Sequence, residues 1–188
     1  KQRPDNFKIP EFHNGEFNFR VKTSKTGIIK FYGYFNSSRL GLRRPDIDSV
    51  GLKDAFSLDN FNVYANLSWK ENIGKKWKLS LGTSYSTNTD KIWNQLQDQS
   101  NAPVNASNEP FDSKSFDLKT KANLATIKAV LERRLFGLSA FRFGGEYLYF
   151  TDENDFSNKF VHHSVTKATD HFKAGFAADD FQTFQFTF

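Results

Sequence analysis

The sequence predicts an all-β protein, an antiparallel up-and-down meander of about eight strands that forms part of a transmembrane β-barrel or a small closed barrel. Three observations predict this class. Apolar residues recur at every second position in several segments, which is the period of a strand whose two faces meet different surroundings. Aromatic residues stand at the ends of such segments, where transmembrane barrels carry their aromatic girdles. Tight turns alternate with long polar connections, as in barrels with short turns at one end and long loops at the other.

The first two predicted strands form a hairpin. Residues 1–14 contain Pro4 and Pro10, which discourage regular structure, so this segment is expected to be an irregular lead-in. Residues 16–22 and 28–35 then alternate apolar and polar side chains, and a short polar turn joins them.

The clearest hairpin joins residues 61–69 to residues 77–85. Both segments alternate strictly, and a short polar connection with a glycine lies between them. Trp69 ends the first strand and Trp77 begins the second, so both indole rings are expected at the same end of the hairpin. An indole has an apolar body and a polar N–H, which suits the boundary between a membrane and water.

The fifth predicted strand covers residues 115–131 and changes parity along its length. Its apolar residues hold even positions up to Leu124 and odd positions from Ala125, which predicts a β-bulge at this point. Residues 124–135 also fit a helix, because alanine and leucine are good helix formers and the apolar spacing is helical. The strand is the preferred interpretation because the neighbouring segments are strands.

The last three predicted strands cover residues 138–150, 171–176 and 181–188. The first of them carries several aromatic residues that alternate with polar ones. In the tail, phenylalanine occupies every second position near the end, so the tail also has the period of a strand.

Long polar segments separate the predicted hairpins: residues 36–59, 87–114 and 151–168. In an up-and-down meander every second connection lies at the same end, so these segments are expected at one end and the tight turns at the other. This arrangement places both chain ends on the extracellular side, which predicts an even-stranded section of a larger barrel wall. The alternatives are a small stand-alone outer-membrane barrel with a structural or adhesive role and a soluble β-barrel ligand carrier.

The composition excludes several classes of function. The chain has 188 residues, enough for a single domain over residues 1–188, and no apolar run approaches the length of about eighteen residues that a membrane helix requires. There is no cysteine, hence no disulfide framework and no thiolate site. The basic residues behind the net charge of +5 are scattered, so no nucleic-acid partner is expected. The absence of methionine and of a signal peptide predicts a processed or excised piece.

Several segments resemble the barrel portion of TonB-dependent outer-membrane receptors: residues 25–35, 41–48, 66–71, 81–88 and 142–147. The resemblance covers residues 15–178. It implies a barrel of about twenty-two strands in a Gram-negative type of cell outer membrane. The barrel would be closed by an N-terminal plug domain and would import a scarce nutrient of the ferric siderophore, cobalamin or glycan class. The sequence lacks the plug and the TonB box, which carry the coupling to the TonB complex, so this chain alone is not expected to perform active transport.

Four candidates for binding a small nutrient ligand lie in the predicted loops: Arg39, Arg43, Arg44 and Trp93. A guanidinium group suits a carboxylate or a phosphate, so the arginines are candidates for an anionic ligand or for lipopolysaccharide phosphates. The indole is a candidate for stacking on a sugar or siderophore ring. The alternative is that aspartates of the same segment neutralise the arginines: Asp46, Asp48 and Asp54.

Six basic residues on the polar strand faces are expected to line the barrel lumen: Arg20, Lys30, Lys78, Lys119, Lys121 and Arg142. A charge on the lipid face is costly, so these residues would form an electropositive interior wall that favours anionic cargo. The apolar residues of the opposite face are expected to meet outer-membrane lipid: Phe17, Phe19, Phe31, Val63, Leu67, Leu79, Leu81, Phe141 and Phe143.

The sequence contains no recognisable catalytic constellation, so no enzymatic activity and no cofactor are expected. Glu146 and Asp117 are the strand carboxylates nearest to such a role. His162 and His163 are adjacent, and adjacent side chains on an extended segment point in opposite directions, so no metal site is expected.

Overall fold

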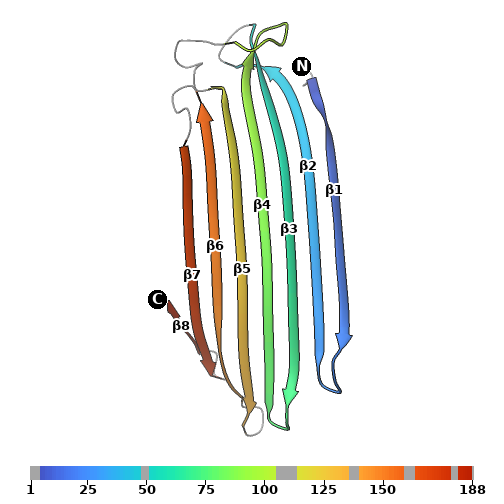
Figure 1. Cartoon of the computed structure of the whole chain (residues 1–188), viewed down its shortest axis with the longest axis vertical. Coiled ribbons are helices and arrows are strands. Elements are labelled where there is room, and N and C mark those ends of the chain that lie inside the picture. The colour runs from blue at the N-terminus through green and yellow to red at the C-terminus, as the bar shows by residue number, and fades with distance from the viewer. Residues whose placement is uncertain are drawn as a thin grey trace.

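The computed structural model of this chain describes residues 5–47, 51–104, 114–135, 140–158, 164–178 and 182–187, with side chains up to residue 157. Within these ranges the chain forms eight strands and runs up and down between a turn end and a loop end (Figure 1). The strands are β1 (Asp5–Lys22), β2 (Ile28–Pro45), β3 (Lys53–Ile73), β4 (Trp77–Gln97), β5 (Phe116–Arg134), β6 (Ala140–Asn158), β7 (Ser164–Ala178) and β8 (Gln182–Thr187).

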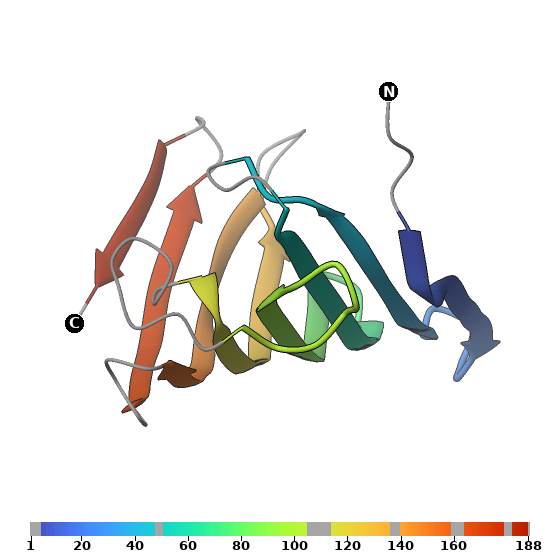
Figure 2. The ribbon, with the colours of Figure 1, turned by 90° about the horizontal axis from the view of Figure 1, so that it is seen from above.

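The strands form one antiparallel sheet in sequence order, so the prediction of an all-β antiparallel meander is confirmed. Seen from above, the sheet is bent into an arc, with β1 and β8 at opposite edges (Figure 2). Because β1 and β8 are not paired with each other in the described strands, the prediction of a small closed barrel is wrong. No helix in the described ranges is long and apolar enough to cross a membrane.

The strands extend much further toward the loop end than the sequence predicts. The irregular lead-in is wrong from Asp5 onward, because β1 begins there. Pro10 is tolerated because β1 is an edge strand whose register with β2 shifts between Lys8 and Glu11. Most of the long polar segments likewise belong to strands, since β2 runs to Pro45 and β4 to Gln97. Near the loop end the apolar residues lie on the even face, for example Leu40, Leu58 and Ile92, and the charged residues lie on the odd face. The alternation that predicts the strands near the turn end is therefore not continued in phase, although the backbone ladder continues.

The fifth strand is a strand and not a helix, as preferred, but the predicted β-bulge is absent. The register of β5 is continuous with both β4 and β6. Leu118 and Leu124 lie on one face and Ile127 on the other, so the apolar residues change face without any slip of the backbone. The cause is that the odd-numbered face of the sheet becomes apolar only toward the turn end.

The register sorts the side chains into two faces. Directly opposed residues share a face, and all pairs within β2–β6 join odd to odd and even to even numbers. The odd face consists of the odd-numbered residues of β2–β6 and of β1 from residue 11 onward. The even face consists of the even-numbered residues of the same segments. The nine residues predicted to meet lipid all have odd numbers, so they share the odd face. Trp69 and Trp77 lie on that face at the turn end, as predicted.

The sheet has almost no hydrophobic core. Among the described side chains, only Ala55 and Leu96 are buried hydrophobic residues. Large apolar side chains are instead exposed, for example Phe17 at 61% and Ile127 at 60%. An apolar surface of this extent indicates that something other than this chain covers the odd face.

A carboxylate anchors the first tight turn. Ser24 Oγ donates a hydrogen bond to Glu71 Oε1 over 2.6 Å, and Thr26 Oγ1 donates to the same oxygen over 2.8 Å. Gly27 leaves room for this carboxylate, since a Cβ at Gly27 would lie 1.9 Å from Glu71 Oε2. The turn between β1 and β2 is thereby tied to β3.

Candidate functional site

The odd face carries an apolar band whose height suits a membrane. On β4 the band begins at Trp77 and extends to Thr87, which is directly opposite Val63 of β3. At about 3.4 Å per residue, this segment covers about 37 Å along the strand. The tilt of about 35–45° that is usual in transmembrane barrels would reduce that length to about 26–30 Å, comparable to their apolar band of about 25 Å.

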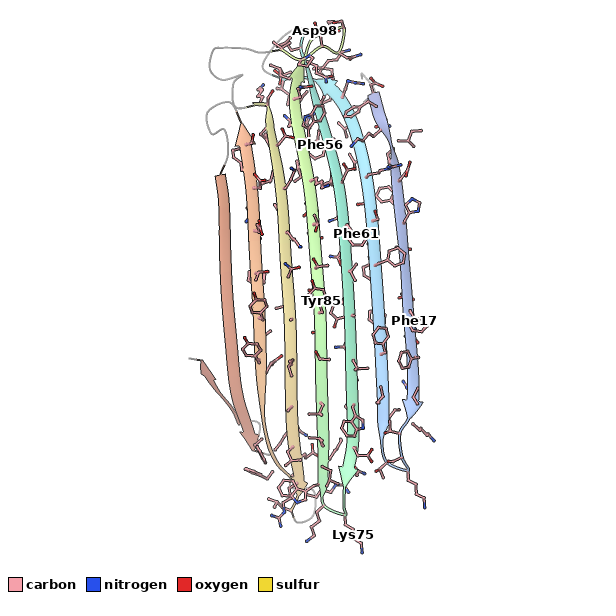
Figure 3. All side chains as sticks on the ribbon, in the orientation of Figure 1. Phe17, Phe56, Phe61, Lys75, Tyr85 and Asp98 are labelled. Atoms are coloured by element: carbon pink, nitrogen blue, oxygen red, sulfur yellow. The ribbon has the colours of Figure 1, made fainter. Side chains whose placement is uncertain are left out.

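Above the band, the odd face is polar and charged. Figure 3 marks the two ends of the sheet, with Asp98 at the loop end and Lys75 at the turn end. One row of opposed residues crosses six strands and contains both signs of charge: Glu11, Arg39, Asp59, Lys91, Lys119 and Asp155. Lys119 and Lys121 therefore lie on the odd face, and the prediction that they share the lumen-facing side with Arg20 is wrong. The prediction assumed that one face of β5 is apolar along its whole length. Above the band the even face carries apolar residues such as Ile92 and Leu118, and the charged residues lie on the odd face.

The three arginine candidates lie on strand β2 and not in a loop, and each is paired with an acidic residue. Arg39 Nη2 is 2.7 Å from Glu11 Oε2, and its hydrogen bond holds the pKa of Glu11 below its usual value. The other two pairs are Arg43–Asp5 at 3.3 Å and Arg44–Asp54 at 3.1 Å. Of the aspartates predicted to neutralise them, Asp54 does so, Asp46 pairs with Lys114, and Asp48 lies outside the described residues.

Trp93 also lies on a strand, on the odd face of β4. Its ring meets Phe7 edge-on, with ring centroids 6.0 Å apart. The two rings line a pocket of about 370 Å³ together with Lys8, Lys91 and Lys119. This pocket opens above the apolar band, on the same side of the sheet.

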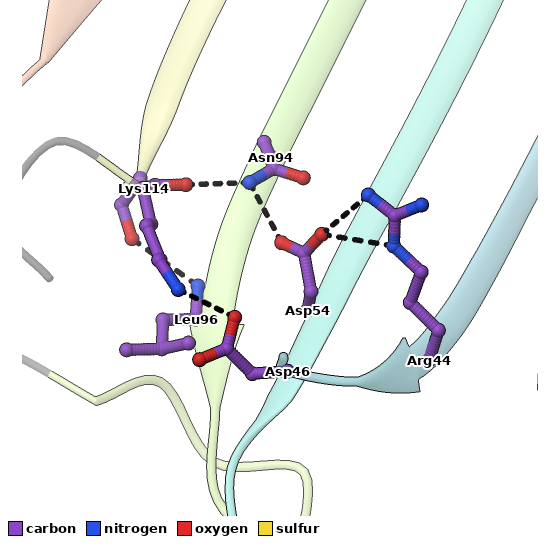
Figure 4. Close-up of polar contacts among 7 residues, drawn as sticks. Arg44, Asp46, Asp54, Asn94, Leu96 and Lys114 are labelled. Carbon is purple, nitrogen blue, oxygen red and sulfur yellow. Dashed lines mark hydrogen bonds and ion pairs between the residues drawn. The ribbon is translucent and has the colours of Figure 1, made fainter. Parts of the chain in front are cut away.

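A polar network joins the strand ends at the loop end (Figure 4). Asp54 accepts hydrogen bonds from Arg44 over 3.1 and 3.2 Å and from Asn94 over 2.8 Å. Asp46 and Lys114 form an ion pair of 2.6 Å in which the side chains are only 7% and 19% exposed. The network connects the ends of β2, β3 and β4 with the segment before β5.

The loop after β4 is held together by hydrogen bonds to the carboxylate of Asp98. Asp98 Oδ1 accepts hydrogen bonds from Ser100 Oγ over 2.6 Å and from the backbone N–H of Ala102 over 2.9 Å. The bond from Ser100, followed by that from Ala102, lowers the pKa of Asp98. Asn101 takes a positive φ of 67°, a left-handed conformation that asparagine tolerates better than most residues.

The middle of the even face is built from amides. Asn60 and Asn62 of β3 each donate to Asn88 Oδ1 of β4, over 2.9 and 3.3 Å. Asn88 Nδ2 in turn donates to Asp90 Oδ2 over 2.8 Å, and Thr120 Oγ1 of β5 lies 3.5 Å from the same oxygen. The sequence marks these residues only as polar, because the cluster depends on the register of three strands.

Tyrosines adjoin the amides on the same face, toward the turn end. Tyr34 is directly opposite Tyr64, and Tyr32 lies two residues before Tyr34 on β2. The rings of Tyr32 and Tyr64 are tilted, with centroids 6.1 Å apart. Tyr64 and Asn62 are two residues apart on one face, a separation of about 7 Å.

The cations of the even face gather at the turn end. Arg20 is directly opposite Lys30 there, whereas Arg142 pairs with Glu132 over 2.8 Å. From Tyr32 to the loop end, the described even-face residues of β1–β6 include one cation, Arg44, which is already paired. Of the six basic residues predicted to line the lumen, the four on the even face therefore all lie near the turn end: Arg20, Lys30, Lys78 and Arg142.

The remaining candidates do not come together. Glu146 lies on the even face and pairs with Lys128 over 3.3 Å, whereas Asp117 lies on the odd face. These two carboxylates are therefore on opposite sides of the sheet. The adjacent histidines His162 and His163 lie outside the described residues, and no cluster able to hold a metal ion occurs within the described ones.

The fold has a counterpart among solved structures. It is similar to the crystal structure of the ferric citrate transporter FecA in its unliganded form, with a TM-score of 0.59 and 8% sequence identity. The chain shares its fold with part of a transporter. The match covers 91% of this chain and 26% of the FecA chain, so this chain spans about a quarter of that length. No protein-family model and no curated protein matches the sequence.

Proposed function

We propose that this chain is a section of the wall of an outer-membrane barrel that imports a scarce nutrient, of the TonB-dependent receptor type. One observation carries the proposal: a one-layer sheet exposes a band of large apolar side chains on one face and a hydrogen-bonding amide cluster on the other. Lipid would cover the band, and the even face would line the lumen. The fold similarity to a transporter supports this function.

The charged row above the band suits the headgroup region of the outer leaflet. Lys91, Lys119 and Lys121 lie on the odd face, directly above the apolar side chains. In the proposed barrel these ammonium groups face lipopolysaccharide phosphates. Coupling to the TonB complex would run through a plug domain supplied outside these 188 residues, and no catalytic role is proposed.

Fractionation of native cell envelopes tests the proposal. An antibody against this sequence is expected to detect a detergent-extracted protein in the outer-membrane fraction, several times heavier than 21.7 kDa. Washing with carbonate or urea is expected to leave that protein in the membrane. Recovery in the soluble fraction, or release by the wash, would exclude a wall section in contact with lipid.

A further inference from the structure

We infer that the cargo of the proposed importer is a neutral, polyhydroxylated molecule of the oligosaccharide class, bound on the even face between Tyr64 and Asp90. This inference rests on the proposed function, because it assumes that the even face lines the lumen. It narrows the nutrient from three chemical classes to one.

The charges of the even face argue against an anionic cargo. Its described part from Tyr32 to the loop end carries Glu16, Asp90, Asp152 and Asp54 but only one cation, which Asp54 already neutralises. A carboxylate-rich iron chelate approaching from the loop end would meet like charges before it reached any free cation. The cations of Arg20, Lys30 and Lys78 lie beyond this zone, at the turn end.

The amide cluster suits hydroxyl groups. A sugar hydroxyl both donates and accepts a hydrogen bond, and an asparagine side chain offers both capacities. Within the cluster, Asn60 and Asn62 donate their N–H groups to Asn88, and Asn60 also donates to Asp90. The side-chain carbonyl oxygen of each asparagine is an acceptor. The Asp90 carboxylate adds further acceptor positions. An acceptor-rich surface attracts O–H donors and repels anions.

The tyrosines supply the apolar part of a sugar site. Tyr32, Tyr34 and Tyr64 form an aromatic surface on the even face, one strand repeat away from the amides. The C–H face of a pyranose ring can lie on such a ring while its hydroxyls reach toward polar groups at the edge. Tyrosine also carries a hydroxyl of its own for hydrogen bonding.

Binding of defined oligosaccharides to the full detergent-purified protein tests the inference. The probes are neutral malto-, xylo-, manno- and fructo-oligosaccharides, with oligogalacturonate and ferric citrate as anionic comparators. At least one neutral probe is expected to bind, and Tyr64→Ala is expected to weaken that binding at least about tenfold. Asn62→Ala is expected to weaken it by about threefold to tenfold.

Val63→Ala is the matched control, since Val63 lies between these two positions on the odd face. The Val63→Ala variant is expected to bind the neutral oligosaccharide as tightly as the unmodified protein does. Binding of an anionic probe alone, binding of no neutral probe, or equal loss in Tyr64→Ala and Val63→Ala would each overturn the inference. If the protein is nevertheless recovered from the outer membrane, the proposed function stands and only the cargo class fails.

Discussion

A lysine in place of Leu67 is expected to destabilise the folded protein by about 2–4 kcal/mol in a lipid bilayer. Leu67 lies near the middle of the apolar band, directly opposite Phe31 on one side and Thr83 on the other, and is 41% exposed. If lipid covers the odd face, the ammonium group would enter the hydrocarbon at about its midplane. Denaturant unfolding of the full protein folded into phospholipid vesicles measures the change.

Asn66→Lys is the control for this substitution. Asn66 is adjacent in sequence but lies on the even face, where it is opposite Tyr32. A lysine there would face the proposed lumen, so a loss below about 1 kcal/mol is expected. Equal losses at the two positions, or a larger loss at Asn66, would contradict the assignment of the odd face to lipid.

Replacing Lys114 by methionine is expected to cost roughly 3 kcal/mol of folding free energy. The side chain of Asp46 is only 7% exposed, and Lys114 Nζ lies 2.6 Å from its carboxylate. Removal of one member of a buried ion pair leaves the other charge in a poorly solvated place. The same unfolding measurement detects the loss.

Two further variants separate this effect from a general loss of packing. The double variant Asp46→Asn with Lys114→Met removes both charges and is expected to recover part of the stability. Lys128→Met breaks the Lys128–Glu146 pair, whose side chains are 55% and 33% exposed, and is expected to cost less than about 1 kcal/mol. A loss at Lys114 no greater than that at Lys128 would show that burial of the Asp46–Lys114 pair does not matter.

The sequence predicts the strands and their faces correctly within the apolar band, but not above it. Between Phe61 and Tyr85 the two faces differ sharply in polarity, so alternation reveals both the strands and their apolar side. Above the band the apolar residues change to the even face, as at Ile92, so the alternation of the band is lost there. The sequence therefore suggests loops where Arg39 and Trp93 lie on strands. The same change of face explains why Lys119 lies on the opposite face from the one predicted.

The register between strands could not be predicted from the sequence, except that the tight turns imply hairpins. Alternation within one strand does not fix the register against the next, so the pairing of Asn60 with Asn88 has no signal in the sequence. The bond from Ser24 to Glu71 likewise joins residues far apart in the chain. The change of parity at Leu124 can be seen in the sequence, but it does not mark a β-bulge. The apolar residues change from the even face to the odd face along a continuous strand.

A scan of single spin-labelled cysteines along β4, from residue 77 to residue 97, tests the central claim most directly. The measurement compares collisions with oxygen, which is concentrated in lipid, against collisions with a water-soluble nickel complex, for the full protein in bilayers. Oxygen accessibility is expected to peak at Leu79, Leu81, Thr83 and Tyr85, to fall at the even positions between them, and to lose this period beyond residue 88. Peaks at the even positions, or no lipid-accessible position anywhere on β4, would contradict the account.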